Sequence, residues 1–399
     1  MATVLSWVVA ALFGLSIANN TAQAQTYSTP YIFLGPPDGL NPEAGLIRDA
    51  VGNLYGTTTE GGTSNAGTVF KVDAAGKETI LYSFLMDTGA PQTPLVRDSA
   101  GNLYGTAQGG TYGDGAVYEL SITGKETTLY SFTGAGGDGR LTMAGVIRDK
   151  SGNLYGTTLS GGSGTCDCGT VFKLTKSGTE TVLHSFTGAG VGGDGAEPYG
   201  GLVQDAAGNL YGTTVSGGDP SCNSGFGCGT VFKIDTAGME TVLYSFTGTG
   251  GDGAFPYATL ILDASGNLYG TTEEGGSHTC KNSSGGTAGC GTVFKLSAAG
   301  KETVLHSFAG GKSGQAPIGG LLRDKLGNLF GTTTQGGIQG CNNGCGTVFK
   351  ISAAGTHIVL YRLTEGPSLG TLVRDAAGNF YGTTVSGGDG NGDVFKLTP

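Results

Sequence analysis

Aspartates that recur at one position of an internal repeat are the first residues in this sequence that could do chemistry. Each stands 11 residues before a second repeated aspartate, and in most repeats a proline follows it four residues later. The five are Asp38, Asp87, Asp138, Asp194 and Asp252, and Ser313 and Thr364 hold the position in the last two repeats. One interpretation is a loop in which each carboxylate accepts nearby N–H groups. The other is a partial ring of carboxylates that would hold a cation, with calcium as the candidate, or a cationic ligand.

Four aromatic residues break the pattern of the repeat: Tyr112, Tyr199, Phe226 and Tyr257. Tyr199 and Tyr257 both follow the proline of the same loop, in adjacent repeats. Aromatic side chains in such places serve as stacking platforms for a sugar or as anchors for a protein partner, or they simply cover neighbouring loops. Together with Asp194 and Asp252, these four are the residues that we single out for ligand binding.

No catalytic motif accompanies these residues. His184 and His306 replace a tyrosine that other repeats carry, which favours a structural role, and His278 and His357 have no identifiable partner. The sequence contains no nucleophile motif, metal-ligand spacing or phosphate-binding loop. We therefore assign no catalytic residue and expect a binding protein rather than an enzyme. The formal net charge of −10, without clustered Lys and Arg, argues against partners such as nucleic acid and anionic lipid.

The eight cysteines fall into four pairs, each within one loop: Cys166 and Cys168, Cys222 and Cys228, Cys280 and Cys290, Cys341 and Cys345. An even, paired count in an exported chain predicts disulfides. Pairing within each loop is the simplest of the connectivities that eight cysteines allow. The bridge between Cys166 and Cys168 is the one we expect to be strained or absent, because only one residue separates them.

A phrase of seven residues, Gly-Asn-Leu-Tyr-Gly-Thr-Thr or a close variant, organises the whole chain. It begins seven times, at Gly52, Gly101, Gly152, Gly208, Gly266, Gly327 and Gly378. Glycine makes up 79 of the 399 residues without a strict collagen period, and clusters between apolar runs. Such a composition is typical of many short strands joined by turns.

The third repeat predicts four strands, which we call a to d. They cover residues 144–149, 154–158, 169–174 and 180–186, with turns or loops between them. A small sheet of this kind cannot cover its own faces, but seven arranged radially bury each face against a neighbour. The fold class is therefore all-β, a seven-bladed β-propeller of four-stranded blades, with a linear β-solenoid as the alternative.

The chain ends decide between a ring and a rod. The last repeat lacks strand d, and a leftover strand, residues 31–34, precedes the first repeat. Pairing of this N-terminal strand with the three C-terminal strands would close the ring. The a–b turns are short and uniform, with an aspartate before each Gly-Asn, whereas the b–c and d–a loops vary in length and share the other face. Variable loops on a rigid frame are where binding usually resides.

Residues 1–24 read as a signal peptide. An apolar run, residues 4–18, is too short to span a bilayer comfortably, and Ala22-Gln23-Ala24 is a small-x-small cleavage site. Residues 25–399 would then form a single propeller domain, a monomer that is secreted, periplasmic or at the cell surface, with no membrane insertion after cleavage. The only tryptophan, Trp7, lies in the segment removed.

The full repeat, from Asp-x-x-Gly-Asn-Leu-Tyr-Gly-Thr-Thr through Gly-Thr-Val-Phe-Lys-Leu to Glu-Thr-Val-Leu-Tyr-Ser-Phe, resembles the GloVer tandem repeat of exported bacterial choice-of-anchor proteins. The resemblance covers about residues 31–399 and implies an extracellular protein, but no catalytic residues. The run Val-Ile-Arg-Asp-Lys-Ser-Gly-Asn-Leu-Tyr is more distantly similar to strands a and b of NHL and gluconolactonase-like propellers.

Three hypotheses for function remain. The first is binding of an extracellular glycan or protein through the cysteine-braced loops. The second is a lyase or hydrolase of polysaccharide or lactone that uses acids such as Asp194 and Asp252. The third is a structural cell-surface protein without a small ligand.

Overall fold

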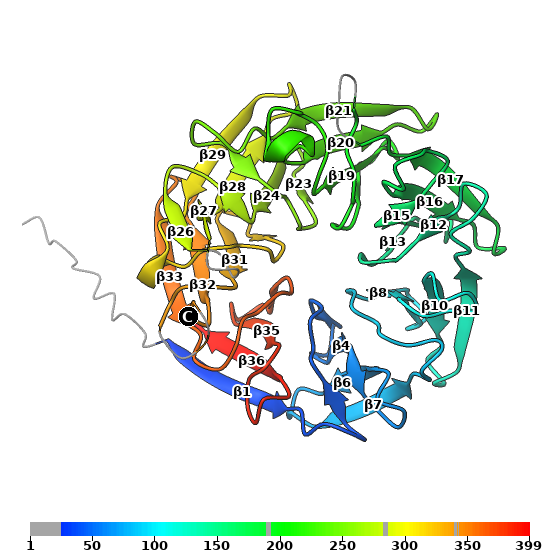
Figure 1. The fold of residues 1–399 in the computed structure, drawn as a ribbon. Coiled ribbons are helices and arrows are strands. Elements are labelled where there is room, and N and C mark those ends of the chain that lie inside the picture. Colours follow the sequence, from blue (N-terminus) through cyan, green and yellow to red (C-terminus); the bar gives the residue numbers. More distant parts are fainter. Residues whose placement is uncertain (1–24, 189–192, 282–285, 339–340, 342) are drawn as a thin grey trace, which may run out of the picture.

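The computed structural model describes residues 25–399 except 189–192, 282–285, 339–340 and 342, so the expected signal peptide, residues 1–24, lies outside the described residues. Seven four-stranded antiparallel sheets stand around a central channel (Figure 1). The predicted all-β, seven-bladed propeller is confirmed. No helix in the described part of the chain has the length and apolar character needed to cross a membrane.

Each blade contains the four predicted strands. The innermost strands, a, are β3 (Ile47–Arg48), β8 (Val96–Arg97), β13 (Ile147–Arg148), β18 (Val203–Gln204), β23 (Ile261–Leu262), β30 (Leu322–Arg323) and β34 (Val373–Arg374). The b strands are β4 (Leu54–Thr58), β9 (Leu103–Ala107), β14 (Leu154–Thr158), β19 (Leu210–Thr214), β24 (Leu268–Thr272), β31 (Leu329–Thr333) and β35 (Phe380–Thr384). Strand a is shorter than predicted. In the third blade only Ile147 and Arg148 pair with strand b, directly before the a–b turn.

The outer half of each blade is longer. The c strands are β6 (Thr68–Val72), β10 (Ala116–Leu120), β16 (Thr170–Leu174), β20 (Thr230–Ile234), β28 (Thr292–Leu296), β32 (Thr347–Ile351) and β36 (Asp393–Thr398). The d strands are β7 (Glu78–Ser83), β11 (Glu126–Ser131), β17 (Glu180–Ser185), β21 (Glu240–Ser245), β29 (Glu302–Ser307), β33 (His357–Arg362) and, for the closing blade, β1 (Thr26–Ile32).

The two ends of the described chain close the ring. Strand β1 pairs antiparallel with β36, with Tyr27 opposite Leu397 and Tyr31 opposite Val394. The prediction of closure is confirmed, but β1 begins five residues earlier than residue 31 and ends at Ile32. The earlier residues join because Tyr27 stacks on Tyr361 of the preceding blade, with ring centroids 4.4 Å apart.

The hydrophobic core lies between the blades. An aromatic ring after strand d of one blade meets a ring on strand c of the next edge-on, as Phe186 does with Phe232 at 5.0 Å. Both rings are essentially fully buried. The glycine in the middle of strand b makes room for the strand c ring, since a Cβ at Gly212 would lie 2.6 Å from Cζ of Phe232.

The a–b turns repeat one hydrogen-bond pattern. In the fourth blade, Asp205 accepts bonds from the backbone N–H and side-chain amide of Asn209, at 2.9 and 2.7 Å, and from the hydroxyl of Tyr211 at 3.0 Å. Burial alone would raise the pKa of Asp205, but these hydrogen bonds outweigh it and hold the pKa below its ordinary value. The uniform turns are therefore scaffold.

The d–a and b–c loops lie on the same face, as predicted. Short two-residue ladders join them: β2 (Gly39–Leu40) with β5 (Glu60–Gly61), β12 (Gly139–Arg140) with β15 (Ser160–Gly161), and β22 (Gly253–Ala254) with β25 (Glu274–Gly275). A hairpin, β26 (Thr279–Lys281) with β27 (Thr287–Gly289), and two 3-10 turns, η1 (Asn223–Gly225) and η2 (Gly311–Ser313), complete these loops.

All four predicted disulfides are present, each within its own b–c loop: Cys166–Cys168, Cys222–Cys228, Cys280–Cys290 and Cys341–Cys345. The bridge between Cys166 and Cys168, which we expected to be strained or absent, is formed. These bridges brace the loops of four adjacent blades on the face that carries the d–a and b–c loops, which we call the loop face.

Candidate functional site: the mouth of the central channel

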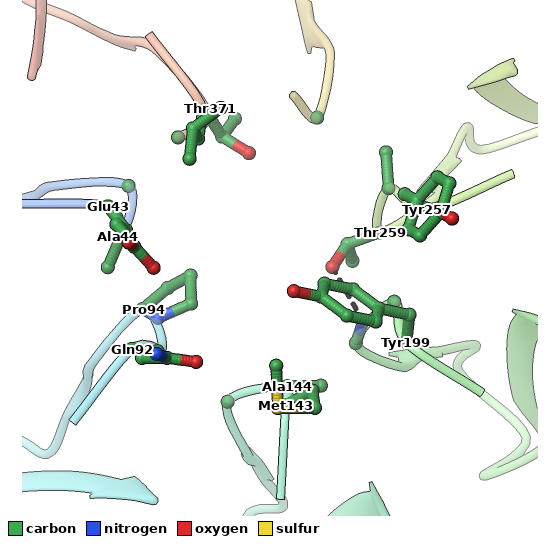
Figure 2. A pocket seen from close by; sticks show the side chains of 18 of the residues that line it. Glu43, Ala44, Gln92, Pro94, Met143, Ala144, Tyr199, Tyr257, Thr259 and Thr371 are labelled. Carbon is green, nitrogen blue, oxygen red and sulfur yellow. Dashed lines mark hydrogen bonds between the residues drawn. The ribbon is translucent and has the colours of Figure 1, made fainter. Parts of the chain in front are cut away.

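One residue from each blade lines a pocket at the loop-face mouth of the channel (Figure 2). Each stands six residues before the aspartate of the a–b turn: Glu43, Gln92, Met143, Tyr199, Tyr257, Ile318 and Leu369. The pocket has a volume of about 440 Å³, which is within the usual range for small-molecule sites. We call these seven residues the mouth ring.

A hydrogen bond between neighbouring blades holds each member of the mouth ring. In every blade, a threonine one residue before the end of strand b donates its hydroxyl hydrogen to a backbone carbonyl of the next blade. The donor–acceptor distances are 2.9 to 3.3 Å. In six of the seven cases that carbonyl belongs to the residue directly after the mouth-ring residue. The donors are Thr57, Thr106, Thr157, Thr213, Thr271, Thr332 and Thr383. Each of these bonds joins a threonine side chain to a backbone carbonyl beside a mouth-ring residue. The bonds therefore do not depend on which side chain the mouth-ring residue carries.

A second layer of small residues forms the floor of the pocket. It includes Gly145, Gly201 and Gly320, with Thr259 and Thr371 between them in the ring. The backbones approach closely here, since a Cβ at Gly145 would lie 2.4 Å from the carbonyl oxygen of Pro94. The Thr259 hydroxyl accepts a 2.9 Å bond from the N–H of Gly201, drawn in Figure 2.

The two tyrosines of the mouth ring touch each other. The rings of Tyr199 and Tyr257 meet edge-on, with centroids 5.2 Å apart and planes at 79°. Burial, then the carboxylates of Glu273 and Glu197, raise the pKa of Tyr257 to about 12, so its hydroxyl stays protonated at neutral pH. Burial and Glu43 likewise raise the pKa of Tyr199. The pair therefore offers aromatic surface to a ligand, and the Tyr199 hydroxyl points into the pocket (Figure 2).

Two half-buried carboxyl groups also line the pocket. Burial and then Glu60 raise the pKa of Glu43, while burial and then Glu274 raise that of Glu273. Figure 2 shows Glu43 and Tyr199 facing one another across the pocket. Gln92 accepts a 2.7 Å hydrogen bond from the side chain of Gln108. Among the described lining residues there is no lysine, arginine or histidine, so the pocket carries acceptors and no positive charge.

Of the residues that the sequence indicated for binding, the structure brings only Tyr199 and Tyr257 together at the channel mouth. Tyr112 and Phe226 are 63% and 70% exposed, in b–c loops outside the pocket. Asp194 and Asp252 are also outside its lining. A lyase or hydrolase that uses Asp194 and Asp252 would therefore need a site other than this pocket.

The aspartates of the d–a loops lie at the outer rim of the propeller, not at the channel mouth. Asp138 accepts bonds from the hydroxyl of Tyr130 on outermost strand β11 at 3.1 Å and from the N–H of Thr133 at 2.8 Å. Asp38 and Asp252 bind their own loops in the same way. Asp38, Asp138, Asp194 and Asp252 thus accept nearby N–H groups, as the first interpretation predicts. Cation binding by the set Asp38, Asp87, Asp138, Asp194 and Asp252 stays a prediction, and the pattern of the repeat did not show which way these loop side chains point.

Sequence reasoning missed Glu43, Gln92, Met143 and Glu273 as pocket residues. A signal was available for the mouth ring: six residues before the turn aspartate, the seven repeats carry six different residue types between well-repeated flanks. The sequence offered no such signal for Glu273, because it directly follows the repeated strand b threonines and resembles an ordinary loop residue.

Solved structures of similar fold support the architecture. A streptogramin B lyase aligns with a TM-score of 0.59 at 14% identity, covering 94% of this chain and 97% of that one. The extracellular domain of BT4673 from B. thetaiotaomicron aligns with 0.58 at 10% identity, over 92% of this chain and 39% of that one. At these identities the likeness shows the fold alone.

Sequence comparison places the chain more narrowly. A search of curated proteins finds no match. The profile of the Gloeobacter/Verrucomicrobia repeat matches residues 12–166, 87–282 and 280–399, which together span nearly the whole chain. With seven copies of that repeat forming seven blades, the protein belongs to the Gloeobacter/Verrucomicrobia repeat family.

Proposed function

We propose that the protein is an exported binding propeller that takes a neutral or cationic ligand, a glycan or a segment of a protein partner, at the channel mouth. The observation that carries the proposal is the mouth ring. Seven equivalent positions converge on one pocket and carry Glu, Gln, Met, Tyr, Tyr, Ile and Leu. Each lies next to a backbone carbonyl that accepts a hydrogen bond from a threonine hydroxyl of a neighbouring blade. A purely structural position would be expected to repeat, as the turn aspartates do.

The chemistry of the lining favours this class of ligand. Two edge-on tyrosines give a stacking surface on one side, and Glu43 and Gln92 give hydrogen-bond acceptors on the other. Aromatic faces and carboxylates bind sugar rings or cationic groups well, whereas an anionic ligand would meet no compensating positive charge among the described lining residues.

Export is the second part of the proposal. Four disulfides support it, since such bonds persist in oxidising compartments. Expression of the full chain in a bacterial host, followed by N-terminal sequencing of the protein outside the cytoplasm, should find a new terminus near Gln25. A product that stays in the cytoplasm with Met1 intact would contradict export.

A glycan panel and a set of cationic small molecules, screened by thermal shift and calorimetry, test the binding site. Ligand that binds only the native state raises the unfolding midpoint. The double variant Tyr199→Ala/Tyr257→Ala should lose at least about tenfold in affinity for any hit, because each ring contributes about 1 kcal/mol and about 1.4 kcal/mol corresponds to tenfold.

The matched control for this test is Tyr112→Ala, which removes an exposed tyrosine of the same face outside the pocket. It should leave affinity unchanged. Equal losses in both variants, or hits whose affinity ignores the tyrosine pair, would contradict a site at the channel mouth. A complete absence of hits would favour the structural cell-surface role.

A further inference from the structure

The outer rim carries a second cluster of polar side chains, between the third and fourth blades. His184 lies on β17, Asp194 in the loop that follows, and Glu240 at the start of β21. One ligand atom of each residue lies within 4.8 Å of the other two. The cluster lies outside the lining of the channel pocket, so it has no part in the proposed function.

Hydrogen bonds fix the orientation of two of the three side chains, His184 and Asp194. Asp194 Oδ1 accepts bonds from the N–H and hydroxyl of Thr187, at 2.7 and 2.8 Å, which leaves Oδ2 to face His184 Nε2 at 2.7 Å. The His184 and Asp194 side chains are only 18% and 12% exposed. Outer hydrogen bonds that orient a ligating carboxylate in this way are a regular feature of metal sites.

The third group has a buried oxygen with nothing to bind. Glu240 Oε1 is buried and has no hydrogen-bond partner. A buried carboxylate oxygen without a partner is costly, and a cation would satisfy it. The equivalent oxygens of Glu78, Glu180 and Glu302 are unpartnered as well, so what distinguishes this cluster is the histidine beside the carboxylates.

Other blade interfaces provide natural comparisons. Asp38 and Asp138 receive a bond from a tyrosine hydroxyl, at 2.7 and 3.1 Å, where Asp194 faces a histidine. Their neighbours Glu78 and Glu180 also keep a buried Oε1 without a partner. A neutral phenol is a poor metal ligand and the imidazole nitrogen is a good one. Among the described residues, the His184 interface is the one where a nitrogen and two carboxylates come together.

We propose that His184, Asp194 and Glu240 bind one divalent transition-metal ion, with zinc as the probe, and that the ion clamps the third blade to the fourth. A nitrogen with two carboxylate oxygens suits zinc or cobalt better than calcium, which prefers oxygen ligands alone. Tetrahedral zinc with bonds of about 2.0–2.2 Å places its ligand atoms about 3.5 Å apart. His184 Nε2 and Asp194 Oδ2 would therefore give up their 2.7 Å hydrogen bond and its proton and separate slightly, while the Glu240 oxygen moves inward by about 1 Å.

The test uses the mature protein without a histidine tag, stripped with chelator and titrated with Zn²⁺ by calorimetry and with Co²⁺ by visible absorption. We expect one equivalent per chain and a rise in the unfolding midpoint with Zn²⁺. His184→Tyr restores the residue of neighbouring interfaces, so it should fold, and it should weaken Zn²⁺ binding at least about tenfold by removing the nitrogen ligand.

Two further variants make the test specific. Tyr244→His places an imidazole beside Asp252 and Glu302 and should add a second equivalent of Zn²⁺. His306→Tyr removes a histidine from an interface where Ser313 replaces the aspartate, and should change nothing. No Zn²⁺ binding by the parent protein, or binding that His184→Tyr leaves intact, would overturn the proposal.

Discussion

The a–b turns and the mouth ring lie six residues apart in the sequence but differ in how their side chains vary from blade to blade. At the turn, every blade uses an aspartate that binds an asparagine of its own turn, as Asp205 binds Asn209. In the mouth ring, the seven side chains are of six kinds, because the bond between blades goes to the backbone carbonyl of the adjacent residue, as from Thr157 to Gly200 beside Tyr199. Positions held by their side chains therefore repeat, whereas positions held by the backbone are free to build a site.

The buried aromatic rings give the largest expected effect on the scaffold side of this comparison. Phe232→Ala removes a fully buried ring that packs against Phe186 and over Gly212. We expect a loss of about 3–5 kcal/mol in the free energy of unfolding, measured by denaturant titration. Tyr199→Ala, at a half-buried mouth position, should cost much less. A similar loss in both variants would remove the distinction between scaffold and site.

The turns should give an intermediate effect. Asp205→Ala leaves Asn209 and Tyr211 without their shared acceptor, which should cost about 1–3 kcal/mol of stability. Ligand affinity at the channel mouth should stay the same, since the turn lies on the opposite face. Weaker binding by folded Asp205→Ala protein would show that the two faces are coupled.

The smallest effect concerns pH and the outer rim. Burial, and next the neighbouring aspartate, raise the pKa of Glu78, Glu180 and Glu302 from the ordinary value of 4.5 to about 7. Between these values the folded protein holds protons that the unfolded chain releases. Stability contributed by these groups is therefore full below pH 4.5, falls as pH rises to about 7, and changes no further above it.

Unfolding midpoints at several pH values between 4.5 and 8 check this linkage. The triple variant Glu78→Gln/Glu180→Gln/Glu302→Gln should show a flatter profile than the parent, because glutamine does not titrate. Met239→Gln, at an exposed position of a c–d turn, serves as the control and should keep the parent profile, because it removes no titratable group. A triple variant with an unchanged slope would mean that these three groups do not set the pH dependence.

Much of the fold was predictable because the same local pattern is repeated seven times. The strands at 154–158 and 169–174 were placed to within one residue, since alternation and turn glycines mark them directly. Strand β1 was placed too late, because Tyr27 joins it only through stacking on Tyr361 of another blade. Two residues of the mouth ring, Tyr199 and Tyr257, were anticipated, but the acids of the pocket were not.

The sequence by itself determined the number of blades, the closure of the ring, the turns and the local pairing of the cysteines, because each depends on residues close together or at a constant period. Only the tertiary structure decided which loop side chains face the axis and which face the rim. Glu43, Tyr199 and Leu369 meet because radial stacking brings one register position of distant repeats to a single point. Asp194 and its equivalents face outward because tyrosines or a histidine of the outermost strands bind them there.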